Sequence, residues 1–244
     1  MVNKPKSAEM HPGPGFRACA DMERPDPATV AALGEFATPT ISDRLNRLFT
    51  MHAAIKPVTR QANRIVGPAC TVRCFPGDNL MVHKSLDLAQ PGDVIVVDTS
   101  SSPLTAVLGD LISTKARHRG IAGFVVDGLI RDLPDIEALG DFPVFARGVT
   151  PIGPLHRGPG EINHAICAGG IVVYPGDVIV GDPNGVVVVP RASAQTVLQR
   201  LDEQAAAEAD YTAAVARGEF SNAWVDAVLE QNGVAIEQPA LEGV

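Results

Sequence analysis

The sequence lacks the features that would place its protein in a membrane or on a nucleic acid. Its 244 residues carry a net charge of −8 and no block of basic residues, which argues against an electrostatic nucleic-acid partner. It contains no run of about eighteen consecutive apolar residues, the length that a membrane span requires. The first residues, MVNKPKSAEMHPGPGF, contain no apolar signal-peptide core. We therefore expect a cytoplasmic protein without a membrane partner.

Cysteines are scarce, and their spacing fits neither a disulfide framework nor a zinc site. There are four, with no CxxC pair among them: Cys19, Cys70, Cys74 and Cys167. Cys70 and Cys74 flank the strand-like TVR, and four positions along an extended strand place two thiols too far apart for a tetrahedral zinc pair. We predict reduced thiols that pack as small hydrophobic residues.

The most informative stretch is GDLISTKARHRGIAGFVVDGLIRD, residues 109–132. KARHRG is typical of a helix C-terminus, with Gly120 just beyond the last turn. IAGFVV predicts a buried strand, and Asp127–Gly128 after it predicts a turn. A helix followed by a strand of this length returns the chain to its starting point, so Asp110 and the Arg131–Asp132 pair can converge at one end of a sheet.

The residue types at these two ends suit a metal and an anion. Asp110 and Asp132 offer the hard oxygen ligands that Mg²⁺ prefers, and Arg131 offers a planar fork for a carboxylate or an oxyanion. A structural interpretation stands beside this one. Asp132 precedes LPDIEALG and could be a helix N-cap, and Asp110 could simply place a negative charge at the start of its helix.

An ordered series of motifs gives this stretch a family resemblance. Besides Asp110, twenty intervening residues and Arg131–Asp132, the chain carries GPACTV (67–72), PGDNLMVHKSLDLAQPGDVIVVD (76–98), GGIVVYPGDVIVGDPNGVVVVP (169–190) and PRASA (190–194). Over roughly residues 38–220 it resembles the class II pyruvate aldolases. More narrowly, it is similar to the 4-hydroxy-4-methyl-2-oxoglutarate / 4-carboxy-4-hydroxy-2-oxoadipate aldolase family, whose fold is shared by the regulator of ribonuclease E activity A.

The resemblance implies both a fold and a reaction. The fold is an α/β layered β/β/α sandwich of the swivelling phosphohistidine type, assembled as a homotrimer or a dimer of trimers. The reaction is a divalent-metal-dependent retro-aldol cleavage of a 4-hydroxy-2-oxo diacid to pyruvate and a second 2-oxo acid. Oxaloacetate decarboxylation is an expected side activity, and the wider setting would be the breakdown of aromatic compounds.

The resemblance also implies roles for individual residues. Mg²⁺, or Mn²⁺ or another divalent cation, would be held by Asp132. Asp110 and Arg131 would be catalytic, and Arg131 would also bind the substrate.

The substrate carboxylate would face Gly109 and the backbone amides of Leu111 and Ile112, at the start of a helix near Gly109. A helix start at Ser102 and Pro103 is the alternative that capping rules allow. Glu208, a weaker assignment, would be a catalytic residue supplied across a subunit interface.

Two other functions stay open at this point. One is a non-catalytic binding protein that resembles the ribonuclease regulator, although those relatives lack the acidic residues Asp110 and Asp132. The other is a different metal-dependent lyase or hydrolase that acts on a 2-oxo acid. Neither the substrate nor the residues that read its distal end can be assigned from the sequence.

The chain falls into three predicted parts: an N-terminal arm (1–25), a catalytic α/β domain (26–192) and a C-terminal helical extension (193–244). The arm is rich in proline, glycine and charge, and the extension is one long helix over residues 193–217 with further sequence beyond it. The catalytic part begins with a helix at Pro27, capped by Asp26. It ends with a hairpin at Asn184–Gly185.

Other polar residues of the catalytic part receive structural interpretations. His83, on the expected helix LMVHKSLDLA, reads as a structural residue rather than a ligand. His156, Glu161 and His164 fall in a glycine- and proline-rich passage (151–170) and have no recognised metal spacing, so we interpret that passage as a solvated loop. The segment RIVGPACTVRCF predicts a strand that is interrupted at Gly67–Pro68.

Overall fold

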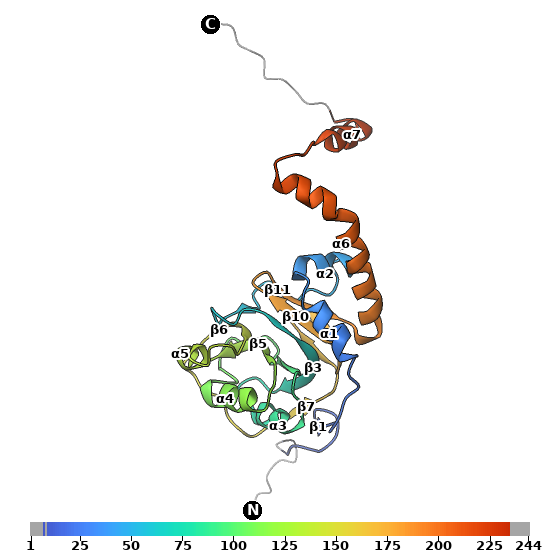
Figure 1. The fold of residues 1–244 in the computed structure, drawn as a ribbon. Helices are drawn as coiled ribbons and strands as arrows, with labels where there is room; N and C mark the ends of the chain where they lie inside the picture. The colour runs from blue at the N-terminus through green and yellow to red at the C-terminus, as the bar shows by residue number, and fades with distance from the viewer. Residues whose placement is uncertain (1–6, 8, 235–244) are drawn as a thin grey trace, which may run out of the picture. The chain divides into compact units, whose positions relative to one another are not determined.

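The computed structural model describes residue 7 and residues 9–234, which form a mixed α/β fold followed by two C-terminal helices (Figure 1). The chain divides into two compact units, the first ending at Leu201 and the second beginning at Asp202. Each is described here by itself. The division falls within a single helix, α6 (Ala194–Ala216).

A twisted sheet forms the centre of the first unit. Its strand order is β1-β7-β3-β4-β5-β6-β2, with bounds β1 Phe16–Ala18, β7 Gly160–Ile162, β3 Ile65–Cys74, β4 Val94–Asp98, β5 Gly123–Ile130, β6 Val144–Val149 and β2 Lys56–Pro57. Strands β3, β4, β5 and β6 run parallel to one another. The sequences of β4 and β5 are almost continuously apolar because both faces of the parallel sheet are covered.

Helices cover one face of the sheet, and shorter strands cover the other. On β4, Ile95 and Val97 pack against α3 (Leu80–Leu88), α4 (Asp110–His118) and α5 (Leu133–Glu137). The alternate residues Val94 and Val96 pack on the opposite side, against β8 (Ile166–Ala168), β9 (Ile171–Val173), β10 (Val178–Asp182) and β11 (Gly185–Val189). A third apolar cluster joins β10 and β11 to α1 (Pro27–Leu33), α2 (Thr38–Arg44) and the start of α6.

Strand β3 serves two sheets, and the predicted interruption at Gly67–Pro68 is wrong. Residues 65–68 pair antiparallel with β10, and residues 69–73 pair parallel with β4. The change of partner falls between Pro68 and Ala69. Pro68 lacks a backbone N–H, which is tolerated because the pairing with β10 ends at this residue and the pairing with β4 begins after it.

The helix and strand predicted between Gly109 and Asp132 are present. Helix α4 ends at His118, and Gly120 lies just beyond it with φ of 73°. The predicted turn at Asp127–Gly128 is wrong, because β5 continues through both residues to Ile130. The pairing of β5 with β6 shifts register between Val126 and Leu129, which marks a β-bulge. The bulge lets a strand contain a dipeptide that is otherwise typical of turns.

Several local predictions are confirmed. Helix α1 begins at Pro27, and the Asp26 carboxylate accepts a hydrogen bond from Thr29 N at 3.0 Å, as an N-cap does. The hairpin at Asn184 is present, since β10 and β11 pair antiparallel and Asp182 faces Gly185 across the turn. The long helix is present as α6.

The described part of the N-terminal arm is more ordered than a tail. Strand β1 pairs with β7 at one edge of the sheet, and the Arg24 guanidinium binds Asp93 through two hydrogen bonds of 2.9 and 2.7 Å. The Arg24 and Asp93 side chains are 19% and 1% exposed. The arm is therefore attached both by backbone pairing and by a largely buried ion pair.

All four cysteines are free thiols, as predicted, but only two of them pack as core residues. Cys70 and Cys74 are buried, and burial raises the pKa of each thiol to about 12. Cys19 and Cys167 are exposed.

The second unit contains the remainder of α6 and α7 (Ala223–Gln231). None of the α7 residues is buried. Across the described residues, no helix combines the length and hydropathy that spanning a membrane would take.

The Arg24–Asp93 pair gives a testable prediction about stability. Arg24→Ala leaves the Asp93 carboxylate buried without its cation, so the free energy of unfolding should fall by about 3 kcal/mol, the scale for breaking a buried pair. Urea denaturation measures this change. Arg47→Ala is the matched control, since its pair with Asp43 is exposed and should be worth less than about 1 kcal/mol. Equal effects of the two changes would contradict the burial argument.

Candidate functional site

The two ends of the stretch from Gly109 to Asp132 lie side by side, as the sequence predicted. The Arg131 amide donates to the Leu108 carbonyl at 3.0 Å, and the Val107 amide donates to the Leu129 carbonyl at 3.0 Å. Ala106 forms a further parallel bridge with Leu129. The segment that leads into α4 therefore runs along the end of β5, and this pairing brings Asp110 close to Arg131 and Asp132.

Asp132 is held in an unusual backbone conformation. Its φ and ψ are 56° and 37°, in the left-handed region that few residues other than glycine adopt, although aspartate tolerates it better than most. It stands at the N-cap position of α5, but its side chain makes no capping hydrogen bond. Instead, its Oδ2 lies 3.1 Å from the Nε of Arg131. The Asp132 carboxylate therefore has no role as a helix N-cap.

Two glycines make room for this pair. Gly109 is buried, and a Cβ atom at that position would overlap the Oδ2 of Asp132. Gly153, from the segment that follows β6, approaches Arg131 in the same way, since a Cβ there would overlap its Nη1. A side chain at position 109 would displace the Asp132 carboxylate, and one at position 153 would shift the end of the Arg131 side chain, so both glycines serve close approach rather than flexibility.

Helix α4 starts at Asp110, with Gly109 at the N-cap. Of the two predicted starts, the one near Gly109 is confirmed, and the one at Ser102 is wrong. The Leu111 and Ile112 amides lie in the first turn, where helix geometry provides no partner for an N–H group. They and the positive end of the helix dipole are available to an anion.

These groups surround a cavity of about 190 Å³. Its lining includes every predicted site residue except Glu208: Gly109, Asp110, Leu111, Ile112, Arg131 and Asp132. Glu208 belongs to the second unit, where it is exposed on α6 and accepts hydrogen bonds of 3.2 Å from Gln204 Nε2. The other lining residues are Asn79, His83, Leu108, Pro154 and His156.

Three of these additional residues are polar, and the sequence interpretation missed all of them. Asn79 is 2% exposed, its Oδ1 lies 2.6 Å from the Nδ1 of His156, and the His156 and His83 rings meet edge to face at 5.5 Å. His83 was interpreted as structural, but it lines the cavity. Burial, and then the nearby His156 and Lys115, lower its pKa below the usual value.

The interpretation of residues 151–170 as a solvated loop holds only in part. His156 is exposed, although its ring is hydrogen-bonded, whereas Glu161 is buried in β7. The Glu161 carboxylate pairs with Arg17 at 2.7 Å and with Arg73 at 3.4 Å. Burial raises the pKa of Glu161, but the hydrogen bond from the Gly15 amide, the hydrogen bond and charge of Arg17, and the nearby His164 lower it below its usual value, so Glu161 acts as a structural ion-pair partner.

The possible metal ligands that line the cavity suit a Mg²⁺ site better than a zinc site whose ligands all come from the protein. Among the residues that the structure describes, no cluster of three or more His, Cys, Asp or Glu side chains could hold a metal. The cavity offers two carboxylates, Asp110 and Asp132, and Mg²⁺ commonly binds through one or two carboxylates and fills its other positions with water and substrate.

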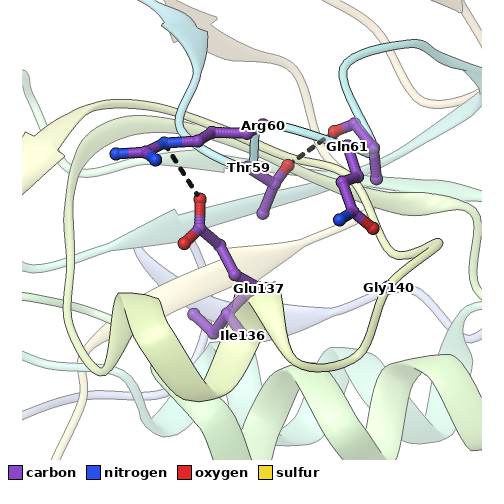
Figure 2. Close-up of a pocket in the computed structure, with 7 residues that line it drawn as sticks. Thr59, Arg60, Gln61, Ile136, Glu137 and Gly140 are labelled. Atoms are coloured by element: carbon purple, nitrogen blue, oxygen red, sulfur yellow. Dashed lines mark hydrogen bonds and ion pairs between the residues drawn. The ribbon is translucent and has the colours of Figure 1, made fainter.

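A second cavity of about 200 Å³ lies at the other end of α5, and Figure 2 shows its lining. Its charged groups are already matched, since Arg60 Nε lies 3.7 Å from Glu137 Oε1. Thr59 Oγ1 donates a hydrogen bond to the carbonyl of Ala62. Arg60 is 92% exposed, so this ion pair is well solvated. The cavity offers no convergence of free carboxylates with an anion-binding backbone, and it is the weaker candidate for chemistry.

Comparison with known proteins shows which family the chain resembles. Residues 38–188 match the family model "RraA-like: Aldolase/RraA". A protein of Halalkalibacterium halodurans named "Putative 4-hydroxy-4-methyl-2-oxoglutarate aldolase" is 44% identical over 169 residues, which cover 69% of this chain and 80% of that protein.

A solved structure is similar to this chain over most of its length. Streptomyces coelicolor RraAS2, described as an unusual member of the RNase ES inhibitor RraA protein family, is 31% identical with a TM-score of 0.70. The match covers 79% of this chain and 99% of that one. From the extent of the family match and from these relatives, the chain belongs to the RraA-like family of aldolases and RraA proteins.

Proposed function

We propose that this protein is a divalent-metal-dependent aldolase that cleaves a 4-hydroxy-2-oxo diacid to pyruvate and a second 2-oxo acid. The observation that carries the proposal is the Arg131–Asp132 pair, which packs closely against the Gly109 backbone beside the N-terminus of α4, in a cavity that Asp110 also lines. The aldolase name of the relative from Halalkalibacterium halodurans agrees with this chemistry.

In this proposal Asp132 holds the cation, Mg²⁺ or alternatively Mn²⁺ or another divalent ion, and water completes its coordination. When bound, the cation supplies Lewis-acid stabilisation of the negative charge that develops on the 2-oxo group of the substrate. The role of the chain is to offer an oxygen ligand beside a guanidinium and a helix N-terminus.

The residues of the chain have distinct tasks in the reaction. The Leu111 and Ile112 amides bind the substrate carboxylate, and Arg131 donates a hydrogen bond to the keto oxygen. As the C3–C4 bond breaks, its electron pair moves into the enolate of pyruvate. Arg131 stabilises the negative charge on the enolate oxygen, which is the former keto oxygen. Asp110 orients a water molecule that removes the C4 hydroxyl proton and later returns a proton to C3. Loss of CO₂ from oxaloacetate gives the same enolate, so we include that side activity.

The assembly and the domain limits are part of the proposal. We place the catalytic domain at residues 26–192 and assign it the swivelling phosphohistidine type of β/β/α sandwich. We propose a homotrimer or a dimer of trimers, in which Glu208 serves the site of a neighbouring copy. The exposure of Glu208 on α6 supports this assignment, because the side chain is available to another molecule.

The structural likeness to RraAS2 keeps a second candidate function open, that of a non-catalytic regulator of an RNase. A different metal-dependent lyase or hydrolase acting on a 2-oxo acid is the other alternative. Pyruvate release from several 4-hydroxy-2-oxo diacids, measured with and without EDTA, separates the aldolase from the other two. An aldolase releases pyruvate only in the absence of chelator, whereas a regulator releases none under either condition.

The first prediction from this mechanism concerns Asp132. Asp132→Asn keeps a side chain that tolerates the left-handed backbone and removes the charge, so it should abolish turnover at any attainable Mg²⁺ concentration. Because its carboxylate caps no amide, the unfolding free energy should change by less than the roughly 1 kcal/mol of a lost cap. Activity titrated with Mg²⁺, together with a thermal melt, measures both quantities. Asp135→Asn, at an exposed position in the same helix, should retain activity.

The second prediction concerns Asp110. Asp110→Asn should lower kcat by about two to four orders of magnitude, the usual contribution of an acid–base group. Binding of pyruvate and metal should remain, because the Leu111 and Ile112 amides and Asp132 are unchanged. Steady-state kinetics measure the change in kcat, and calorimetric titration with pyruvate measures the retained binding. A variant that keeps the wild-type kcat would remove Asp110 from the mechanism.

The third prediction concerns Arg131. Arg131→Lys keeps the positive charge but loses the planar fork, so kcat should fall strongly while KM changes less. Arg131→Ala should raise the activation free energy by about 3 kcal/mol or more, the scale of one lost oxyanion donor. Oxaloacetate decarboxylation should fall in parallel with both variants.

Arg117→Lys, an exposed arginine on α4 that pairs with Asp141, is the matched control and should behave as wild type. If Arg131→Lys raises only KM, then Arg131 anchors the substrate carboxylate and does not stabilise the enolate.

A further inference from the structure

The cavity has a second polar end, built from Asn79, His83 and His156, which the proposed reaction does not use. We refer to these three residues as the imidazole end. Asn79 and His83 come from the start of α3, and His156 comes from the segment between β6 and β7. That segment is fixed beside the turn before α3, because the Asn79 amide donates to Leu155 O at 2.9 Å and the Leu155 amide donates to Gly77 O at 2.8 Å.

The hydrogen bonds of Asn79 determine which nitrogen of His156 carries a proton. Asn79 Nδ2 donates to the Val107 carbonyl at 2.8 Å, and a carbonyl can only accept, so the Oδ1 of Asn79 faces His156. His156 Nδ1 is therefore the donor in the 2.6 Å bond to that oxygen. The remaining nitrogen, Nε2, accepts hydrogen bonds when the ring is neutral and donates only when the ring is protonated.

The charges around His83 favour an anion. Besides burial, the two groups that lower its pKa are His156, from the segment between β6 and β7, and Lys115, from α4, and both repel a proton. The carboxylates that line the cavity are Asp110 and Asp132; Asp132 is paired with Arg131, and neither carboxylate is among the groups that shift the pKa of His83. A negative group within hydrogen-bond reach of both imidazoles would relieve this repulsion and would favour protonated rings.

We propose that the imidazole end binds the distal carboxylate of the substrate, through His83 and His156 oriented by Asn79, while the Arg131 end binds the 2-oxo acid. This inference rests on the proposed function, since it assigns the second end of the same molecule. It makes the protein selective for diacids. A monoacid would leave the polar groups of this end without a partner, and such groups discriminate strongly against an analogue that lacks the matching charge.

The test is a comparison of two ligands that differ only in the distal group. 2-Oxoglutarate and 2-oxopentanoate have the same chain length and the same 2-oxo acid, but only 2-oxoglutarate has the second carboxylate. Titration calorimetry of the full chain with Mg²⁺ should give a Kd for 2-oxoglutarate that is about tenfold or more lower, the worth of one charge-assisted hydrogen bond. No turnover is needed, so this result does not depend on the aldolase assay.

Substitutions then locate the effect. His83→Gln and His156→Gln should each remove most of the advantage of 2-oxoglutarate and leave the Kd of 2-oxopentanoate unchanged. His156→Lys should restore part of the advantage, because it returns a cation. His118→Gln, at the exposed last residue of α4, is the matched control and should bind both ligands as the wild type does.

A proton measurement distinguishes direct binding from a structural role. Titrations in two buffers with different ionisation heats should show proton uptake with 2-oxoglutarate and none with 2-oxopentanoate, because only the distal carboxylate favours protonated rings. Equal Kd values for the two ligands in the wild type, or an equal loss of both in the histidine variants, would overturn the inference. Absence of pyruvate release with retained selectivity for 2-oxoglutarate would instead refute the aldolase proposal and leave the anion subsite standing.

Discussion

The candidate site depends on one steric constraint, the close approach of the Gly109 backbone to the Asp132 carboxylate. This approach is possible because β5 returns the chain beside the segment that precedes α4, and the two are joined by backbone hydrogen bonds at Val107 and Arg131. The same return places the start of α4 beside Arg131. A side chain at position 109 would displace the Asp132 carboxylate, and its Cβ would also crowd the Cγ of Arg131.

Several elements could be predicted from local patterns. The helix that ends just before Gly120, the buried strand after it and the cap at Asp26 follow from periodicity and from the chemistry of helix ends, which depend on a few neighbouring residues. The length of β5 could not be predicted in this way. Asp127–Gly128 has the composition of a turn, and only pairing with β6 through a bulge keeps it within a strand.

The imidazole end shows why the rest of the site was not visible in the sequence. Asn79 and His156 are 77 positions apart, and no period or motif connects them. Each residue considered alone has an ordinary structural interpretation, one after a turn and the other in a loop. Their pairing exists because the segment after β6 lines the cavity and forms backbone hydrogen bonds with the turn before α3. Contacts of this kind depend on tertiary structure, to which local propensity is insensitive.

The pairing of β3 with both β4 and β10 has a consequence for folding during synthesis on the ribosome. Residues 69–73 gain their partner β4 early in synthesis, but the other edge of β3 waits for β7 and for β10, which pairs with residues 65–68. Until residue 182 has been made and released, the nascent chain carries a long strand with one open edge, the kind of surface that pairs with other chains. Completion of the sheet is therefore a late event in synthesis, and chaperone protection of this edge is most valuable before the β10–β11 hairpin arrives.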